Sequence, residues 1–271
     1  MQVIDLTEQY VPLYCECLED WSAEIKEAGD HKKQWFERMQ GKGLRVKLAL
    51  DDQGSVGGMI QYVPVQYSFL EGTDLYVVLC IWVHGHPQGR GNFQGRGMGK
   101  ALLQAAEADA LALGAKGMAA WGLALPFWMK ASWFKKHQYR RVDRMGLQVL
   151  LWKPFVQDAV PPKFIRQKER PLAAPGKVTV TAYSNGWCPA QNLALERAKR
   201  AAFDPAFKGK VVFREIDTFD REVLLRCGIC DALFIDGKRI RTGPPPSYEK
   251  IHRAIGKKVK RLRPAHVDNQ A

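Results

Sequence analysis

The chain has 271 residues and a formal net charge of +13, with 46% of its residues hydrophobic and 10% aromatic. This composition is typical of folded globular proteins and excludes a disordered chain, and the length favours two domains over one. No apolar run approaches the roughly 18 residues of a membrane span, and Asp5 and Glu8 stand where a signal peptide would be basic and then apolar. We therefore expect a cytoplasmic protein that does not enter a membrane.

Charge and cysteines are distributed unevenly. Residues 1–152 carry 17 basic and 16 acidic side chains, whereas the remainder carries 24 and 12. The cysteines are too sparse for a secreted disulfide framework, so in a reducing compartment we expect them to be free, catalytic or metal-binding. They are Cys15, Cys17, Cys80, Cys188, Cys227 and Cys230.

Hydrophobic periodicity predicts an α/β domain over residues 1–152. In chain order its expected elements are helices within Val11–Met39, strands Leu44–Leu50, Gly58–Gln66 and Leu75–Val83, a glycine-rich loop, helix Lys100–Leu113, strand Gly117–Gly122, a helix around Trp128–His137 and strand Gly146–Trp152.

The glycine-rich loop lies between an apolar strand and an alanine- and leucine-rich helix. Glycines in this position let backbone N–H groups converge at a helix N-terminus, where the helix dipole favours a pyrophosphate, although they also make tight turns without a ligand. The Walker and dinucleotide-binding patterns do not fit. The loop consists of Gln94, Gly95, Arg96, Gly97, Met98, Gly99 and Lys100.

This loop resembles the Q/R-x-x-G-x-G/A pyrophosphate loop of the GNAT acetyltransferases. The order of elements over residues 1–152 is also similar to that family, and residues 131–139, ASWFKKHQY, resemble the segment that closes its fold. The resemblance implies a mixed, mostly antiparallel sheet flanked by helices. It further implies acetyl-CoA as co-substrate, held by residues 94–100 at its pyrophosphate and by the backbone of Ile81, Trp82 and Val83 along its pantetheine arm.

Two positions depart from the family pattern. Phe134 stands where many members have a tyrosine that protonates the leaving thiolate, so another group does this or transfer has been lost. The loop His84–Phe93 is longer than usual. Within it His84 and His86 are candidates for the general base, or else they shape the loop or bind phosphate. Glu107 and Asp109, on the following helix, are expected to be solvated.

Residues 153–177 contain five prolines and many charges, which predicts a linker. A smaller domain is expected over residues 178–256, and residues 257–271 form a basic tail. The predicted elements of this smaller domain are strand Val178–Tyr183, a loop with Cys188, helix Ala190–Ala202, strand Val211–Ile216, a short helix, strand Ala232–Ile235, a turn, a strand, and helix Ser247–Ile255.

The second domain places Cys188 directly before a helix, an arrangement that lowers a thiol pKa. The strand, cysteine and helix order resembles thioredoxin-like folds, but Gln191 stands at the resolving-cysteine position and Asp231 at the cis-proline position. Cys227 and Cys230 precede that position, so the three thiols are expected to converge. They could do redox chemistry, bind a soft metal, or simply pack. Together with residues 243–251, GPPPSYEKI, the domain resembles the YoaP-type domain that follows a GNAT domain.

Two functions from different classes remain. The first is an N-acetyltransferase that transfers acetyl from acetyl-CoA to a small-molecule amine, with a thiol- or metal-related metabolite as one candidate. The second is a thiol-redox or soft-metal-binding protein that uses Cys188, Cys227 and Cys230, with a vestigial or regulatory CoA site. Nucleic acid is not an expected partner, because no aromatic interleaving accompanies the basic tail.

Overall fold

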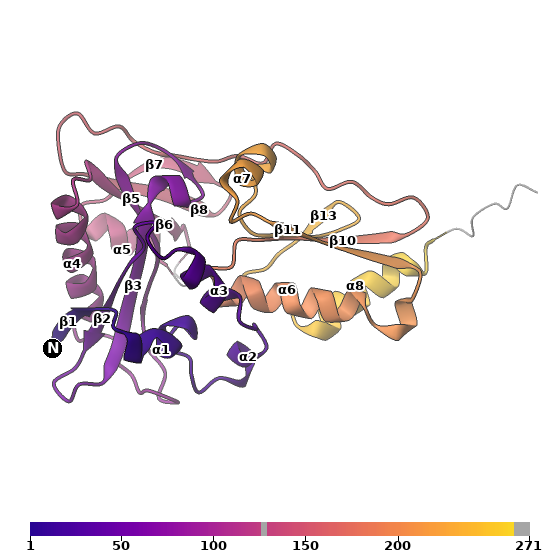
Figure 1. The fold of residues 1–271 in the computed structure, drawn as a ribbon, viewed down its shortest axis with the longest axis horizontal. Coiled ribbons are helices and arrows are strands. Elements are labelled where there is room, and N and C mark those ends of the chain that lie inside the picture. The colour runs from indigo at the N-terminus through magenta and orange to yellow at the C-terminus, as the bar shows by residue number, and fades with distance from the viewer. Residues whose placement is uncertain (126–128, 263–271) are drawn as a thin grey trace, which may run out of the picture. The chain divides into compact units, whose positions relative to one another are not determined.

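The computed structural model describes residues 1–125 and 129–262 and divides into two compact units (Figure 1). Unit 1 comprises Met1–Ser22 and Phe36–Arg166, and unit 2 comprises Ala23–Trp35 and Gln167–Ala271. The second unit thus takes a segment from near the N-terminus in addition to the C-terminal part of the chain. Among the described residues, no helix is long and apolar enough to cross a membrane.

Unit 1 is built on a seven-stranded sheet with the order β1-β2-β3-β5-β6-β8-β7. All neighbours are antiparallel except β5 and β6, which are parallel. The strands are β1 Gln2–Asp5, β2 Arg45–Leu50, β3 Val56–Pro64, β5 Leu75–Val83, β6 Gly117–Leu123, β7 Arg140–Met145 and β8 Gln148–Pro154. A separate two-stranded pairing joins β4 Leu70–Glu71 to β9 Lys163–Phe164.

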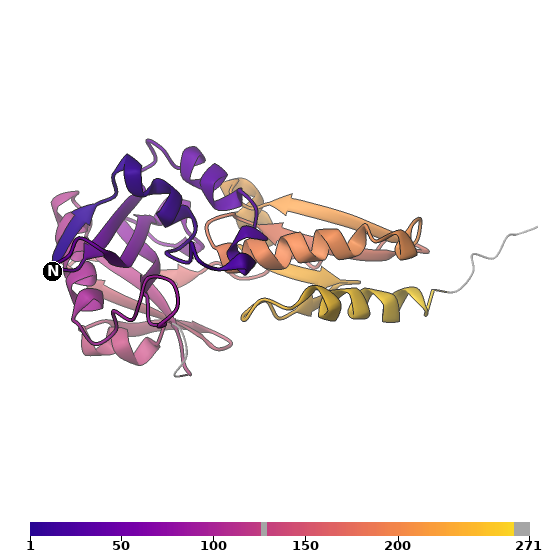
Figure 2. The ribbon, with the colours of Figure 1, turned by 90° about the horizontal axis from the view of Figure 1, so that it is seen from below.

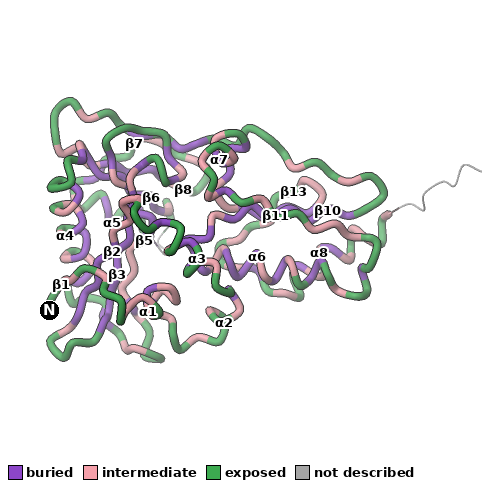
Figure 3. Tube along the Cα trace, viewed as in Figure 1, coloured by how far each residue is buried: buried purple, intermediate pink, exposed green. Residues whose placement is uncertain are grey.

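Apolar residues on an inner strand and on one helix form the core around this sheet. Strand β3 is mostly apolar, with Gln61 as its amide side chain, and eight of its nine residues are buried (Figure 3). Helix α4, Met98–Ala112, packs on this sheet through Met98, Leu102, Leu103, Ala106 and Ala110, which recur at helical spacing. Shorter helices complete the unit: η1 Glu8–Tyr10, α1 Val11–Cys15, η2 Val65–Tyr67 and α5 Ala131–Lys136.

Unit 2 has a four-stranded sheet with the order β11-β10-β12-β13. Strands β10 Val178–Ser184 and β11 Val211–Asp217 are parallel, while β12 Ala232–Ile235 is antiparallel to β10 and to β13 Lys238–Ile240. Its helices are α2 Ala23–Lys26, α6 Pro189–Ala202, η3 Pro205–Phe207, α7 Arg221–Cys227 and α8 Tyr248–Val259, and α3 His31–Arg38 contributes its first residues.

Alternation along the central strand gives unit 2 two cores. Val178, Val180 and Ala182 of β10 pack with α6 and α8, which run side by side in Figure 2. Tyr183 faces the other way, into a smaller cluster that includes Cys227 at the end of α7.

The domain borders differ from those expected from the sequence. Residues 153–177 are not a single linker, because β8 extends to Pro154 and Lys163–Phe164 pairs with β4 inside unit 1. Residues 257–259, including Lys257 and Lys258, belong to α8 rather than to a tail. Residues 263–271, and Trp128 in the expected helix Trp128–His137, lie outside the described residues.

Candidate functional site

The two parallel strands of unit 1 separate half-way along their length. Only the first four residues of β5, Leu75–Val78, pair with β6, where their partners are Gly117–Ala120. Beyond this point the indole of Trp121 donates a hydrogen bond to the Leu79 carbonyl at 2.8 Å. Ile81–Val83 therefore have no described strand partner on the β6 side, and they are less buried than the preceding four residues. This leaves one backbone edge open for a ligand.

The glycine-rich loop, residues 94–100, comes after β5 in the chain and leads into α4. Gly97 is the N-cap residue, with a φ of 83°, and Gly95 has a φ of 78°. Both conformations are left-handed and favour glycine. A Cβ built on either residue would meet nothing within 4 Å, so the backbone here faces open space. The N-cap residue makes no side-chain hydrogen bond to the helix, and among the described residues the first N–H groups of α4 are available to an anion.

A cavity of about 420 Å³ joins the open strand edge to the loop. This volume lies in the range of small-molecule sites. Of the residues predicted to hold CoA, all except Arg96 line the cavity, while the Arg96 guanidinium stacks on the Phe93 ring at 5.2 Å. The lining consists of Ile81, Trp82, Val83, Phe93, Gln94, Gly95, Gly97, Met98, Gly99, Lys100, Met129, Lys130, Trp133 and Phe134.

The segment before and within α5 adds Met129, Lys130 and Trp133 to the lining, and the sequence did not single these three residues out. Phe134 is 1% exposed and packs edge-on against Trp133 at 5.0 Å. Both rings line the cavity. The nearby Tyr139 is not among the lining residues, and burial raises the pKa of its hydroxyl well above the ordinary value. It is therefore a poor replacement as a proton donor.

His84 is buried and both of its ring nitrogens are engaged. The Trp21 indole N–H donates to Nε2 at 3.0 Å, and Nδ1 lies 2.7 Å from the Gly91 carbonyl. Because an indole only donates and a carbonyl only accepts, the ring is neutral with its proton on Nδ1. The geometry contradicts His84 as a general base, since its lone pair is already used. His86, by contrast, is exposed.

A carboxylate that the sequence did not single out lies beside these histidines. Glu19, in the loop after α1, is close to His84 and His86 and to the indoles of Trp82 and Trp21. Burial raises its pKa, and the neighbouring imidazoles and indoles offset part of the rise. No spacing rule connects residue 19 with residues 82–86, so only the fold could reveal this cluster.

The acidic residues of α4 are not solvated, contrary to expectation. Asp109 accepts two hydrogen bonds from Arg45 at 2.8 Å and one from Tyr62 at 2.5 Å. Burial raises the pKa of Asp109, but the Arg45 and Tyr62 hydrogen bonds outweigh it and hold the pKa below its ordinary value. Glu107 pairs with Lys153 at 2.7 Å. These groups fasten the helix to the sheet.

The three thiols of unit 2 do not converge as expected. Cys188 is the N-cap residue of α6. It lies close enough to Cys230 to influence its titration, whereas Cys227 packs in the separate cluster with Tyr183. Within residues 1–125 and 129–262, no group of three or more His, Cys, Asp or Glu could hold a metal ion.

Cys230 instead has a carboxyl partner. Its thiol donates to Asp231 Oδ2 at 3.1 Å, and the Asn185 amide donates to Asp231 Oδ1 at 3.1 Å. Burial and the adjacent Asp231 raise the pKa of the Cys230 thiol well above its ordinary value. Burial also raises the pKa of Asp231. The pair therefore favours the protonated thiol over the thiolate.

Comparison with known proteins places GNAT structures next to this chain. A GNAT-family acetyltransferase from Brucella melitensis in complex with acetyl-CoA is 15% identical, with a TM-score of 0.41 over 59% of this chain and 90% of its own. The GNAT N-acetyltransferase YhbS from Escherichia coli, in complex with CoA, is 11% identical, with a TM-score of 0.43 over 60% and 88%.

A third similar structure is the PaiA N-acetyltransferase from Thermoplasma acidophilum with coenzyme A, 14% identical, with a TM-score of 0.40 over 57% and 100%. No protein-family model and no curated protein matches the chain. At these identities and TM-scores the likeness alone says nothing about substrate or catalytic residues.

Proposed function

We propose that unit 1 is an N-acetyltransferase that binds acetyl-CoA in the 420 Å³ cavity and transfers the acetyl group to a small amine. The observation that carries this proposal is the alignment of an open strand edge with an uncapped helix N-terminus in one cavity. Backbone amides at the start of α4 suit a pyrophosphate, and the edge at Ile81–Val83 suits the amides of a pantetheine arm.

The chemistry required of the protein is modest. The acceptor nitrogen attacks the thioester carbonyl, a C–N bond forms, and the C–S bond breaks to release CoA as a thiolate, which takes a proton from water. Backbone N–H groups at the open edge of β5 would stabilise the negative charge on the carbonyl oxygen. With His84 engaged, His86 remains the histidine that could take a proton from the acceptor. Phe134 cannot protonate the departing sulfur.

Calorimetry with acetyl-CoA tests the proposal, and the fold supplies a matched control. Gly97 and Gly114 both have a φ of 83° and open space around them, but Gly97 precedes α4 and Gly114 follows it. Both replacements by glutamate cost similar backbone strain. Gly97→Glu should weaken binding more than tenfold through charge and bulk, while Gly114→Glu should change it less than twofold. Absence of binding to the unmodified protein, or equal losses in both variants, would overturn the assignment.

We further propose that unit 2 is a thioredoxin-like domain of the YoaP type. Its support is the strand order β11-β10-β12-β13, with a parallel pair followed by an antiparallel hairpin, and a cysteine at the N-cap of α6. On this proposal Cys188 is the reactive thiol, because a helix N-terminus favours the thiolate.

Peptide-resolved labelling with iodoacetamide near pH 7 distinguishes this role from a purely structural one. Cys188 should be labelled faster than Cys80, which is equally buried but lies inside a strand. Asp231→Asn should change the labelling rate of Cys230 more than that of Cys227, because only Cys230 donates to Asp231. Equal labelling of Cys188 and Cys80 would mean that the domain uses no thiol chemistry.

A further inference from the structure

Two loops of unit 1 are built to pack against each other beside the cavity. One is residues 16–22 after α1, and the other is His84–Phe93 after β5. Besides the bond between Trp21 and His84, Arg90 pairs with Asp20 at 3.2 Å. Gly89 has no room for a side chain, since a Cβ there would lie 2.1 Å from the Trp21 ring. The longer loop is therefore an ordered wall rather than a loose insertion.

This wall is closed at its base as well. The Phe93 amide donates to the His84 carbonyl at 2.9 Å, and Gly85 bridges to Asn92. The His84 amide is in turn bound by the Gly57 carbonyl of β3. These contacts fix the direction in which residue 86 leaves the sheet, so the exposed His86 ring is held in place by its neighbours.

The wall gathers aromatic rings around one carboxylate. The His86 ring centroid lies 6.4 Å from that of Trp21 and 6.3 Å from that of Trp82. Glu19 lies beside the same rings. Trp82 also lines the cavity, so this cluster of Glu19, Trp21, Trp82 and His86 adjoins the strand end where the thioester would lie.

The chemistry of the cluster selects one kind of ligand. A carboxylate attracts a cation, and indole faces add cation–π attraction and cover an apolar group. Arg90 of the neighbouring loop pairs with Asp20 rather than with Glu19. We infer that Glu19, Trp21, Trp82 and His86 form the acceptor subsite, and that the acceptor is a primary ammonium joined by a short chain to an aromatic or apolar group. The role of this subsite in acetyl transfer rests on the proposed function, whereas the binding of such an ammonium compound does not.

Calorimetry with two probes of equal shape tests the subsite. 2-Phenylethylamine is a cation at pH 7, and 2-phenylethanol is its neutral counterpart. The full chain, saturated with CoA, should bind the amine at least fivefold more tightly than the alcohol. Glu19→Gln should reduce this preference below twofold, whereas Glu19→Asp should retain part of it. Glu16→Gln, which removes a carboxylate from the same loop outside the cluster, should leave the preference intact.

The outcomes separate this inference from the proposed function. If acetyl-CoA binds but the unmodified chain does not prefer the amine, or Glu19→Gln keeps the preference, the subsite is wrong and the CoA assignment stands. If acetyl-CoA does not bind but the charge preference is present without CoA and depends on Glu19, the proposed function fails and the cation site stands. In acetyl-transfer assays with 2-phenylethylamine, Glu19→Gln should raise KM at least fivefold. A change in kcat alone would contradict a binding role.

Discussion

At the residue scale, contacts decide the roles that residue types leave open. The sequence marked His84 and His86 equally, since both follow an apolar strand, yet one is buried between an indole and a carbonyl and the other is exposed. The glycine-rich loop could be predicted because backbone conformation and anion binding both demand glycine there. Glu19 could not, because its significance comes from residues more than 60 positions away.

His84→Ala tests the structural role of this imidazole. Removing the ring leaves the Trp21 N–H and the Gly91 carbonyl without their partner, which should lower the free energy of unfolding by about 1–3 kcal/mol. Urea denaturation measures the loss. Acetyl-transfer activity, measured well below the unfolding transition, should keep the pH dependence of the unmodified protein. Disappearance of a pH-dependent step in kcat would instead restore His84 as the base.

Phe134→Tyr tests the missing acid. If the ring faces the leaving sulfur, a hydroxyl there should raise kcat or shift its pH dependence, because a positioned acid contributes roughly 100-fold or more in favourable cases. Affinity for acetyl-CoA, measured by calorimetry, should change less than twofold. Phe134→Met alters the side chain without adding a proton donor and serves as the control. Identical pH–rate profiles for the tyrosine variant and the unmodified protein would show that residue 134 does not face the sulfur.

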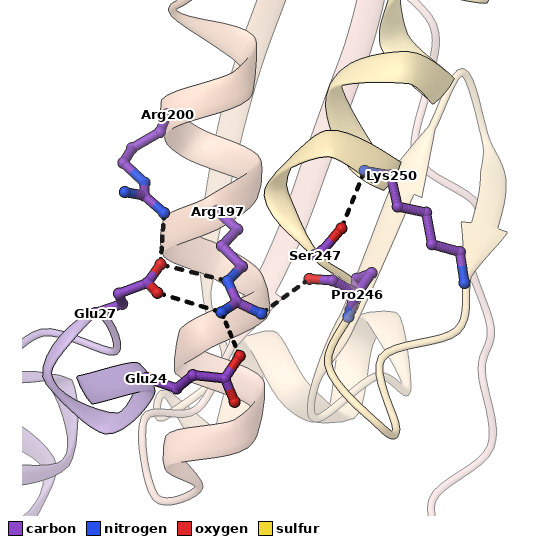
Figure 4. A network of polar contacts seen from close by, with 7 residues as sticks. All are labelled: Glu24, Glu27, Arg197, Arg200, Pro246, Ser247 and Lys250. Atoms are coloured by element: carbon purple, nitrogen blue, oxygen red, sulfur yellow. Dashed lines mark hydrogen bonds and ion pairs between the residues drawn. The ribbon is translucent and has the colours of Figure 1, made fainter. Parts of the chain in front are cut away.

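At the element scale, the sequence predicts where a helix forms more readily than it predicts which unit the helix packs with. The pattern over Val11–Met39 predicted helices, but nothing in it shows that Ala23–Trp35 joins the second unit. Its attachment depends on ion pairs with residues about 170 positions later. Arg197 of α6 binds Glu24 at 2.8 Å and Glu27 at 3.3 Å, and it also donates to the Pro246 carbonyl (Figure 4). Strands β1 and β7 were missed because they are short or highly charged edge strands.

Arg197→Ala should destabilise unit 2 because the Arg197 side chain is only 8% exposed and joins three partners. The expected cost is about 1–3 kcal/mol. Arg200→Ala is the matched control: this side chain is 54% exposed, and its ion pair with Glu27, together with its contact with the Tyr248 ring at 5.5 Å, should contribute at most about 1 kcal/mol. Urea denaturation followed by far-ultraviolet circular dichroism measures both, and equal losses would contradict the central role of Arg197.

The loss of stability caused by Arg197→Ala should depend on pH. The Arg197 hydrogen bond lowers the pKa of Glu27 in the folded state. A lowered folded-state pKa stabilises the fold above the unfolded-state pKa, and this contribution is lost as pH falls through the folded-state value. The difference between Arg197→Ala and the unmodified protein should therefore be full at pH 7 and shrink below about pH 4. A difference that stays constant down to pH 3 would mean that packing, not charge, fixes the segment.

At the scale of the whole molecule, the α/β class of unit 1 followed from its strand and helix patterns. Each of the two larger sheets contains a parallel pair whose crossover includes a helix, α4 between β5 and β6 and α6 between β10 and β11. The borders of the units could not be predicted from the sequence, because composition does not distinguish residues 23–35, which belong to unit 2, from the flanking residues of unit 1. His31 of α3 pairs with Glu196 at 2.7 Å, and Trp35 packs over Gly186 beside Cys188.

A fragment of residues 167–271 expressed alone should consequently be unstable. It would lack the acidic partners of Arg197 and the cover that Trp35 gives to Gly186. Addition of a peptide of residues 23–38 in trans should raise its melting temperature in a concentration-dependent manner. A peptide with Glu24→Gln and Glu27→Gln should do so less. A fragment that is equally stable with and without the peptide would show that the segment is dispensable.

Because residues 23–35 belong with the C-terminal part of the chain, order of synthesis matters for folding. At about 5–20 residues per second, roughly 10–45 s pass between emergence of Trp35 and emergence of α8. Unit 1 can assemble on the ribosome during this interval, whereas Glu24, Glu27 and the Trp35 ring must wait for their native partners. The nascent chain therefore holds residues 23–35 without these contacts until Gly186 and α6 have emerged.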